Sequence, residues 1–135
     1  MNVEMMVDTR GAGDQSPLTG HRSPPADGWV AVCRLEDIVP GTGVCARLNG
    51  RQVAVFRVDD RAVYAIDNHD PFSHANVLSR GIVGDLKGEL VVASPVYKQH
   101  FSLLTGRCIE DDSVSVAVYR AAIRDADVLV LNPNL

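Results

Sequence analysis

The sequence predicts an all-β domain. From Trp29 onward, short runs rich in β-branched residues alternate with turn residues. The dipeptide Asn49-Gly50 separates two of these runs, and it is a strong signal for a two-residue hairpin because both turn positions need φ > 0. No stretch after Trp29 repeats apolar residues at helical spacing. We therefore expect a single domain of several small antiparallel sheets within the 135 residues.

Residues 1–28 differ in composition from the rest of the chain. They are rich in Gly, Pro, Ser, Thr and Asp and show no sustained apolar periodicity. Their one apolar cluster is Met5, Met6 and Val7. We expect residues 1–28 to be a disordered or flexible tail and residues 29–135 to form the β domain.

The strands follow from the apolar runs and from the turn residues between them. The turns are predicted at residues 40–43 (Pro-Gly-Thr-Gly), 49–50 (Asn-Gly), 59–60 (Asp-Asp), 87–88 (Lys-Gly) and 105–106 (Thr-Gly). The strands predicted between and around them are 29–34, 44–48, 52–58, 62–66, 82–85, 89–93, 101–103, 114–119 and 126–131.

Two segments do not fit this hairpin pattern and are predicted to be protruding loops. Residues 67–80 form a long irregular stretch, and residues 94–99 form a short one of unusual composition. Loops longer than about 12 residues in a small β domain are usually functional. We expect the chemistry of this protein to reside in these two loops.

Composition and charge exclude several classes of function. The net charge is −4 and the Lys and Arg residues are scattered, whereas nucleic-acid binding needs a clustered basic face. No stretch approaches the roughly 18 apolar residues of a membrane helix, and no secretory signal is evident. Cys33, Cys45 and Cys108 are an odd number without a CxxC pair, which favours small core residues in a reducing compartment. A cytoplasmic protein without nucleic-acid or membrane partners is expected.

The two loops resemble the metal-binding loops of the Rieske family. Residues 64–75 read YAIDNHDPFSHA, and residues 92–106 read VASPVYKQHFSLLTG. In that family a C-P-H loop and a C-P-x-H loop hold a [2Fe–2S] cluster through two Cys and two His. Both prolines, Phe101 and the Thr105-Gly106 turn fit the frame, and the resemblance extends from about Trp29 to Leu131. It implies a Rieske-like fold of small antiparallel sheets.

The ligand positions of that frame hold other residues. Asp70 and Phe72 stand at the Cys-x-His positions, and Ser94 and Tyr97 stand at the Cys-x-x-His positions. An iron–sulfur cluster needs soft thiolate donors, and Phe72 cannot coordinate a metal at all. The sequence therefore predicts that the cluster has been lost and that this chain holds no cofactor.

This pattern of replacements is similar to that of the small subunits of assimilatory NAD(P)H nitrite reductases. The residues that carry the likeness are 70–73 (DPFS), 79–85 (SRGIVGD), 94–95 (SP), 98–101 (KQHF) and 106–108 (GRC). The resemblance implies an accessory subunit of an oxidoreductase, without catalytic residues of its own. It also implies a large subunit that carries FAD, a [4Fe–4S] cluster and sirohaem and reduces nitrite to ammonium in nitrate assimilation.

The residues of the former cluster site have several possible roles. We expect Asp70 to cap a turn, and Phe72 and Tyr97 to fill the space of the missing cluster with their rings. An acid–base role for Asp70 lacks an obvious second group. A metal site of His69, His74, His100 and Asp70 has chemically adequate ligands, but their spacing matches no standard zinc pattern.

The flanks of the two loops are candidates for partner binding. The resemblance implies that this end of the molecule faces a partner, and the candidate residues are Arg80, Lys98, Gln99 and His69. Arg80 is the best anchor among them, because Arg is enriched in interface cores and Lys is depleted. A solvated loop charge is the alternative for Arg80.

Two other functions remain open at this point. One is a Rieske-type electron-transfer ferredoxin, which the missing ligands argue against. The other is a stand-alone protein-binding module that uses the same fold for a different partner. The acidic run Glu110-Asp111-Asp112 is predicted to be a solvated turn.

Overall fold

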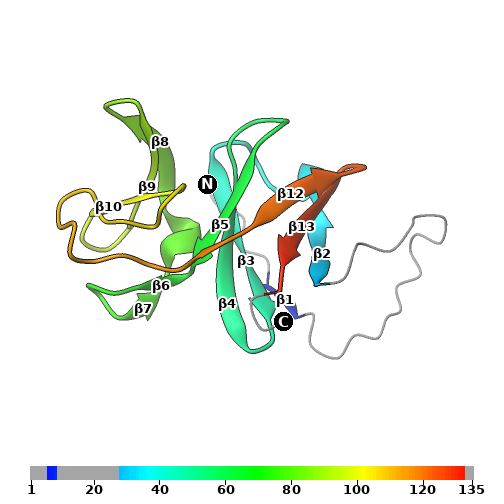
Figure 1. Ribbon diagram of the computed structural model, residues 1–135, viewed down its shortest axis with the longest axis horizontal. Coiled ribbons are helices and arrows are strands. Elements are labelled where there is room, and N and C mark those ends of the chain that lie inside the picture. Colours follow the sequence, from blue (N-terminus) through cyan, green and yellow to red (C-terminus); the bar gives the residue numbers. More distant parts are fainter. Residues whose placement is uncertain (1–5, 9–27, 133–135) are drawn as a thin grey trace.

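The computed structural model describes residues 6–8 and 28–132 (Figure 1). Strand β1 (Met6–Asp8) lies inside the segment that we predicted to be a tail, and it pairs in parallel with β3. The sequence did not indicate this strand. The rest of the predicted tail, residues 1–5 and 9–27, lies outside the described residues.

A sheet of five strands occupies the middle of the molecule. Its order is β1-β3-β4-β5-β11. Strand β3 pairs antiparallel with β4, β4 with β5, and β5 with β11. The strands are β3 (Thr42–Leu48), β4 (Arg51–Arg57), β5 (Val63–Asp67) and β11 (Val118–Tyr119).

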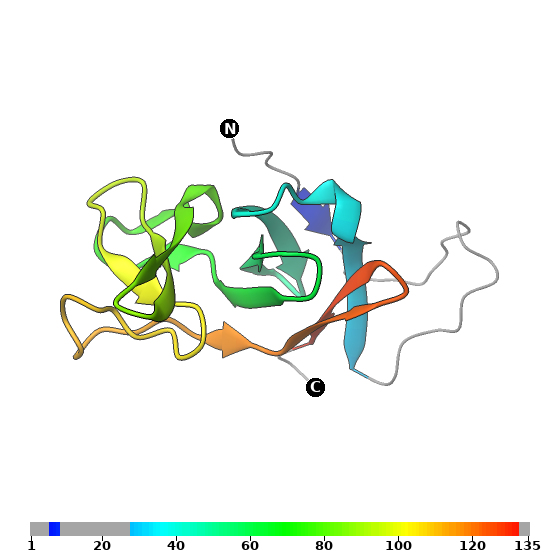
Figure 2. The ribbon, with the colours of Figure 1, turned by 90° about the horizontal axis from the view of Figure 1, so that it is seen from above.

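Two three-stranded antiparallel sheets lie on either side of this central sheet (Figure 2). One has the order β12-β13-β2 and contains β2 (Trp29–Arg34), β12 (Ala121–Arg124) and β13 (Asp127–Leu131). The other has the order β10-β9-β8 and contains β8 (Ile82–Leu86), β9 (Glu89–Ala93) and β10 (His100–Ser102). Short 3₁₀ turns η2 (Leu35–Asp37) and η3 (Leu78–Arg80) complete the chain. The predicted all-β fold is confirmed.

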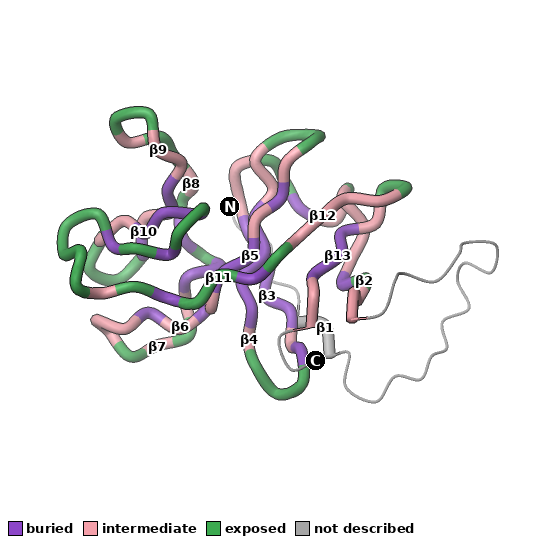
Figure 3. Tube along the Cα trace, viewed as in Figure 1, coloured by how far each residue is buried: buried purple, intermediate pink, exposed green. Residues whose placement is uncertain are grey.

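Strand β4 shows why the central sheet is buried on both faces. Val53 and Val55 belong to the core cluster under β2, β12 and β13, whereas Ala54 and Phe56 belong to the cluster under β8–β10. Successive side chains of a strand point to opposite faces, so four apolar residues in a row supply two cores. Figure 3 shows this buried centre flanked by exposed loops.

The predicted turns form where their residues permit positive φ. Asn49 and Gly50 have φ of 50° and 83°, and Lys87 and Gly88 have φ of 56° and 87°. Both pairs connect antiparallel neighbours, β3 with β4 and β8 with β9. The hairpin predictions at these two positions are confirmed.

Two predicted segments differ from the structure. The stretch 67–80 is not wholly irregular, because it contains the strand pair β6 (His69–Asp70) and β7 (Ala75–Asn76) as well as η3. The strand predicted over 114–119 is shorter, and only β11 forms a ladder. The reason is that this segment changes sheets: Ser115 bridges Arg107, whereas Val118 pairs with Ile66 of the central sheet.

Across residues 6–8 and 28–132, helices of the length and apolar character needed to cross a membrane do not occur.

Candidate functional site

The candidate site is the place where the first loop (67–80) meets the second loop (94–99). Ser94 Oγ donates a hydrogen bond to Asp70 Oδ2 at 2.5 Å, and neither residue has exposed surface. Asp70 and Ser94 stand at the two positions where the Rieske resemblance places thiolate ligands. A direct hydrogen bond between side chains therefore links the loops at these positions.

Asp70 also organises the first loop, as predicted. Its Oδ1 accepts hydrogen bonds from the backbone N–H groups of Phe72 at 2.9 Å and Ser73 at 3.4 Å, which caps the turn. Burial by itself raises the pKa of Asp70, but the hydrogen bonds from Ser94, Phe72 and Ser73 outweigh it and hold the pKa below its usual value. Asp70 is therefore a buried carboxylate that stays ionised at neutral pH.

The two rings that we expected to fill the cluster position lie in different surroundings. Phe72 packs against the core cluster under β8–β10, with its ring centroid 6.1 Å from that of Phe101. Tyr97 does not pack there, since its side chain is 61% exposed. The prediction for Tyr97 is wrong because the second loop is closed at its root by Ser94 N donating to Gln99 O, which leaves the middle of the loop in solvent.

The donor set at these positions does not fit a [2Fe–2S] cluster. Asp70 and Ser94 offer hard oxygen atoms that are already hydrogen-bonded to each other. Phe72 has no atom that could coordinate a metal. Tyr97, at the fourth position, is largely exposed to solvent, whereas Asp70 and Ser94 are buried. We derive no chemistry through a cluster at this site.

Asn68 is a key residue of the first loop that we did not identify in the sequence. It is 1% exposed, and its Nδ2 donates to Gln52 Oε1 at 3.0 Å and to Asn76 O at 3.1 Å. Its Oδ1 accepts from Ser79 N at 2.7 Å. Asn68 thus joins both ends of the first loop to β4. No local pattern signals this role, because all of its partners come from other elements.

The three histidines considered as metal ligands do not converge. His69 and His74 lie on the first loop with ring centroids 6.0 Å apart, and His69 Nδ1 lies 3.0 Å from Asn76 Oδ1. His100 instead pairs with Glu110, with Nδ1 and Oε2 2.5 Å apart. In the described part of the chain, His, Cys, Asp and Glu side chains form no group of three or more that could hold a metal. Glu110 thus contacts both the backbone N–H and the ring of His100 and is not only part of a solvated turn.

The partner-binding candidates lie around the two loops. Arg80 ends η3 and is exposed, and Lys98 is exposed with its Nζ 3.4 Å from Pro95 O. Gln99 and His69 are half-buried, and Gln99 Oε1 lacks a hydrogen-bond partner among the described residues.

Exposed apolar residues lie beside these charges, which the sequence did not indicate. Val96 is 43% exposed and Tyr97 61%, both on the second loop. Ile82 is 73% exposed and pairs with Ala93, directly before that loop. We call Arg80, Ile82, Val96, Tyr97 and Lys98 the loop face.

The cysteines have the character expected of core residues. Cys45 and Cys108 are buried, and Cys33 is partly exposed. Burial, with smaller contributions from Asp37 and Asp127, raises the pKa of Cys33 to about 12. Burial also raises the pKa of Cys108. Because the thiolate is the reactive form, raised pKa values make these thiols poor nucleophiles.

Comparisons with known proteins agree with the resemblance. Residues 28–131 match the family of Rieske-like [2Fe-2S] domains. The chain is 50% identical over 101 residues to the nitrite reductase (NADH) small subunit of Salmonella typhimurium, which covers 74% of this chain and 94% of that protein. The solution structure of a nitrite reductase [NAD(P)H] small subunit from Erwinia carotovora superimposes with a TM-score of 0.67 at 50% identity, covering 78% of this chain and 82% of that one.

A further relative contains a homologous segment within a larger polypeptide. The nitrite reductase [NAD(P)H] large subunit of Klebsiella oxytoca is 41% identical to this chain over 128 residues, which are 93% of this chain and 13% of that protein. These matches cover nearly all of the described domain at high identity. The chain belongs to the family of nitrite reductase small subunits, a branch of the Rieske-like [2Fe-2S] domains.

Proposed function

We propose that this chain is the accessory small subunit of a cytoplasmic NAD(P)H-dependent nitrite reductase, and that it has no catalytic residues of its own. The observation that carries the proposal is the hydrogen bond between Asp70 and Ser94. These two residues stand at ligand positions of the Rieske frame, in a chain that belongs to this family. Such a chain contributes binding and structure rather than electron transfer. FAD, the [4Fe–4S] cluster and sirohaem reside on the large subunit, which reduces nitrite to ammonium in nitrate assimilation.

The large subunit is the proposed partner. One support is that the relatives are named as nitrite reductase small subunits. The other is the large subunit of Klebsiella oxytoca, in which a segment homologous to this chain is part of the same polypeptide. A domain that is fused to a partner in one organism commonly binds that partner as a separate chain in another, because fusion raises the effective concentration of an existing interaction.

The loop face is the proposed contact surface, together with Gln99 and His69. It combines three exposed apolar side chains with the cations Arg80 and Lys98. An apolar centre with Arg at its edge is the composition of many protein interfaces. A partner surface with apolar and acidic residues complements it.

The first experiment is affinity purification of the tagged chain from its native host grown on nitrate. Recovery of a large polypeptide with flavin and sirohaem absorbance supports the proposal. Recovery of the lone chain, or of an unrelated partner, would leave the fold assignment intact but overturn the function.

Iron analysis of the purified chain separates the proposal from the ferredoxin alternative. We expect less than stoichiometric iron and no visible absorbance of a cluster after anaerobic purification and reconstitution with iron and sulfide. A reconstituted chain with the two iron and two sulfide of a Rieske centre would favour the ferredoxin.

A further inference from the structure

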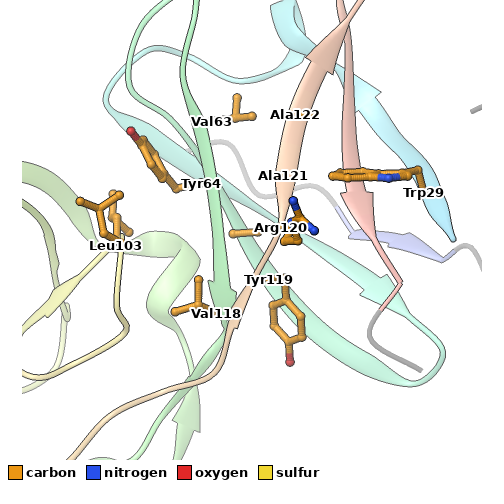
Figure 4. Close-up of a pocket in the computed structure, with 11 residues that line it drawn as sticks. Trp29, Val63, Tyr64, Leu103, Val118, Tyr119, Arg120, Ala121 and Ala122 are labelled. Carbon is orange, nitrogen blue, oxygen red and sulfur yellow. The ribbon is translucent and has the colours of Figure 1, made fainter. Parts of the chain in front are cut away.

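A groove of about 530 Å³ lies between the central sheet, β12 and the turn that follows β10 (Figure 4). It shares no residue with the loop face. Its floor and walls are mostly apolar or aromatic, and they consist of Trp29, Val63, Tyr64, Ala65, Leu103, Leu104, Val118, Tyr119, Arg120, Ala121 and Ala122.

Part of the apolar lining of the groove is exposed to solvent. Leu104 is 59% exposed and Val118 is 41% exposed, and both line the groove. Among the described lining residues, Arg120 is the one charged side chain. A segment with apolar side chains and a carboxylate near Arg120 is chemically complementary to this lining.

Both ends of the domain lie at the groove. Trp29, a lining residue, pairs with Leu131, and Leu131 N donates to the carbonyl oxygen of Arg120, another lining residue, at 2.9 Å. Asn132 N donates to Gly28 O at 2.6 Å, so the two ends of the described domain are held together. The last described residues at both ends of the domain therefore lie next to residues that line the groove.

In one relative, a segment homologous to this chain is part of the same polypeptide as a large subunit. The match to the Klebsiella oxytoca large subunit is longer than the stretch from Gly28 to Leu135, so it includes sequence on the N-terminal side of Gly28. The homologous segment is 13% of that protein, so the rest of the large subunit is joined to one or both of its ends. In the described structure the two ends of this domain, Gly28 and Asn132, are hydrogen-bonded to each other next to Trp29 and Leu131.

We propose that this groove is a second docking site, separate from the loop face, and that it receives an apolar segment of the nitrite reductase large subunit. The inference rests on the proposed function, because it takes the large subunit as the partner. It adds that the subunit is held on the side where its two ends lie, and that Leu104, Val118 and Arg120 contact the partner.

The test compares Leu104→Asp with Val39→Asp in binding the purified large subunit of the same organism. Val39 is a matched control because it is 49% exposed and lies outside both the groove and the loop face. We expect Leu104→Asp to weaken binding at least about tenfold, as for a central apolar contact, and Val39→Asp to bind like the wild type. Circular dichroism establishes that both variants are folded.

A photocross-linking residue, p-benzoylphenylalanine, at position 104 or 39 identifies the occupant directly. Cross-linking from position 104 to the large subunit, and not from position 39, supports the groove as a docking site even if Leu104→Asp fails to fold. Cross-linking to a second copy of this chain, or within the chain itself, would overturn the inference. So would wild-type affinity of a folded Leu104→Asp variant.

The two proposals fail in different ways. If the wild-type chain does not bind the large subunit at all, the proposed function is wrong and the groove inference is overturned with it. If the wild type binds and the groove variant binds equally well, the groove inference alone is overturned.

Discussion

The hydrogen bond between Asp70 and Ser94 links the two loops through residues that are 24 positions apart in sequence. In a Rieske centre, metal coordination performs this linkage. In this chain an ionised carboxylate, held by one hydroxyl and two backbone N–H groups, links the loops at the corresponding positions. This hydrogen bond explains how the two loops stay joined although Asp70 and Ser94 stand at the positions of the thiolate ligands.

Ser94→Ala is expected to destabilise the fold by about 1–3 kcal/mol, because it leaves Asp70 Oδ2 buried without its donor. The measurement is urea denaturation followed by circular dichroism. Ser113→Ala is a suitable control, since Ser113 Oγ also bonds an Asp but is exposed, and we expect little change there. Equal stabilities of wild type and Ser94→Ala would contradict the role of this bond.

Asp70→Asn tests the charge on the same bond. Because the pKa of Asp70 is lowered in the folded protein, the ionised form stabilises the fold at pH values above the usual Asp pKa of about 4. This contribution is lost as the pH falls through the folded pKa. The difference in free energy of unfolding between wild type and variant is therefore largest near neutral pH and shrinks below about pH 4. A difference independent of pH in acid would show that the charge does not matter.

Arg80→Glu is expected to weaken binding to the large subunit about tenfold or more, because it reverses a charge on the proposed loop face. Arg61→Glu makes the same change on an exposed turn of the central sheet and serves as the control. Surface plasmon resonance with the large subunit immobilised measures both. Unchanged affinity of Arg80→Glu would remove the loop face from the proposed interface.

At the scale of elements, turns determine where strands meet. Gly106 follows β10 with φ of 78°, and a Cβ there would overlap the carbonyl oxygen of Val116. Its own N–H bonds Ser102 O at 2.9 Å, and its carbonyl oxygen accepts from Val116 N at 2.8 Å. The turn thus fixes the segment that leads from the β8–β10 sheet to β11.

Gly106→Ala is expected to destabilise the domain by about 1–3 kcal/mol or more. Alanine disfavours the left-handed backbone at this position, and its Cβ would overlap the carbonyl oxygen of Val116. Gly88→Ala is an informative comparison, because Gly88 has φ of 87° but open space around its Cβ position. We expect a smaller loss of thermal stability for Gly88→Ala. If the two variants lose equal stability, the overlap with Val116 contributes nothing.

At the scale of the whole molecule, the central sheet belongs to both cores. Residues of β4 and β5 alternate between the cluster under β2, β12 and β13 and the cluster under β8–β10. Neither small sheet can lose its packing without exposing one face of the central sheet. The domain is therefore one structural unit although it has two cores.

This arrangement predicts a single cooperative unfolding transition. Trp29 is the one tryptophan of the chain and reports on the β2 side, so its fluorescence can be compared with NMR signals of Phe101 on the other side. We expect coincident denaturation midpoints for both probes. Separate midpoints would mean that the two cores unfold independently.

The sequence by itself determined most of the strands, the hairpins and the positions of the two loops. These features depend on residues that are neighbours in the chain: the side-chain alternation of a strand has a period of two, and Asn49-Gly50 adopts positive φ with little strain. The resemblance in the loops likewise rests on contiguous motifs. The short strand β1 escaped prediction because three residues are too few to show a period.

The tertiary structure alone decided which side chains are buried and which partners they find. It exposed Tyr97 where we expected packing, buried Asn68 among three other segments, and paired Asp70 with Ser94. It also brought Trp29 and Arg120 to the same groove as the domain ends. The physical reason is that burial and hydrogen bonding between distant residues depend on how whole sheets pack, which local propensities do not specify.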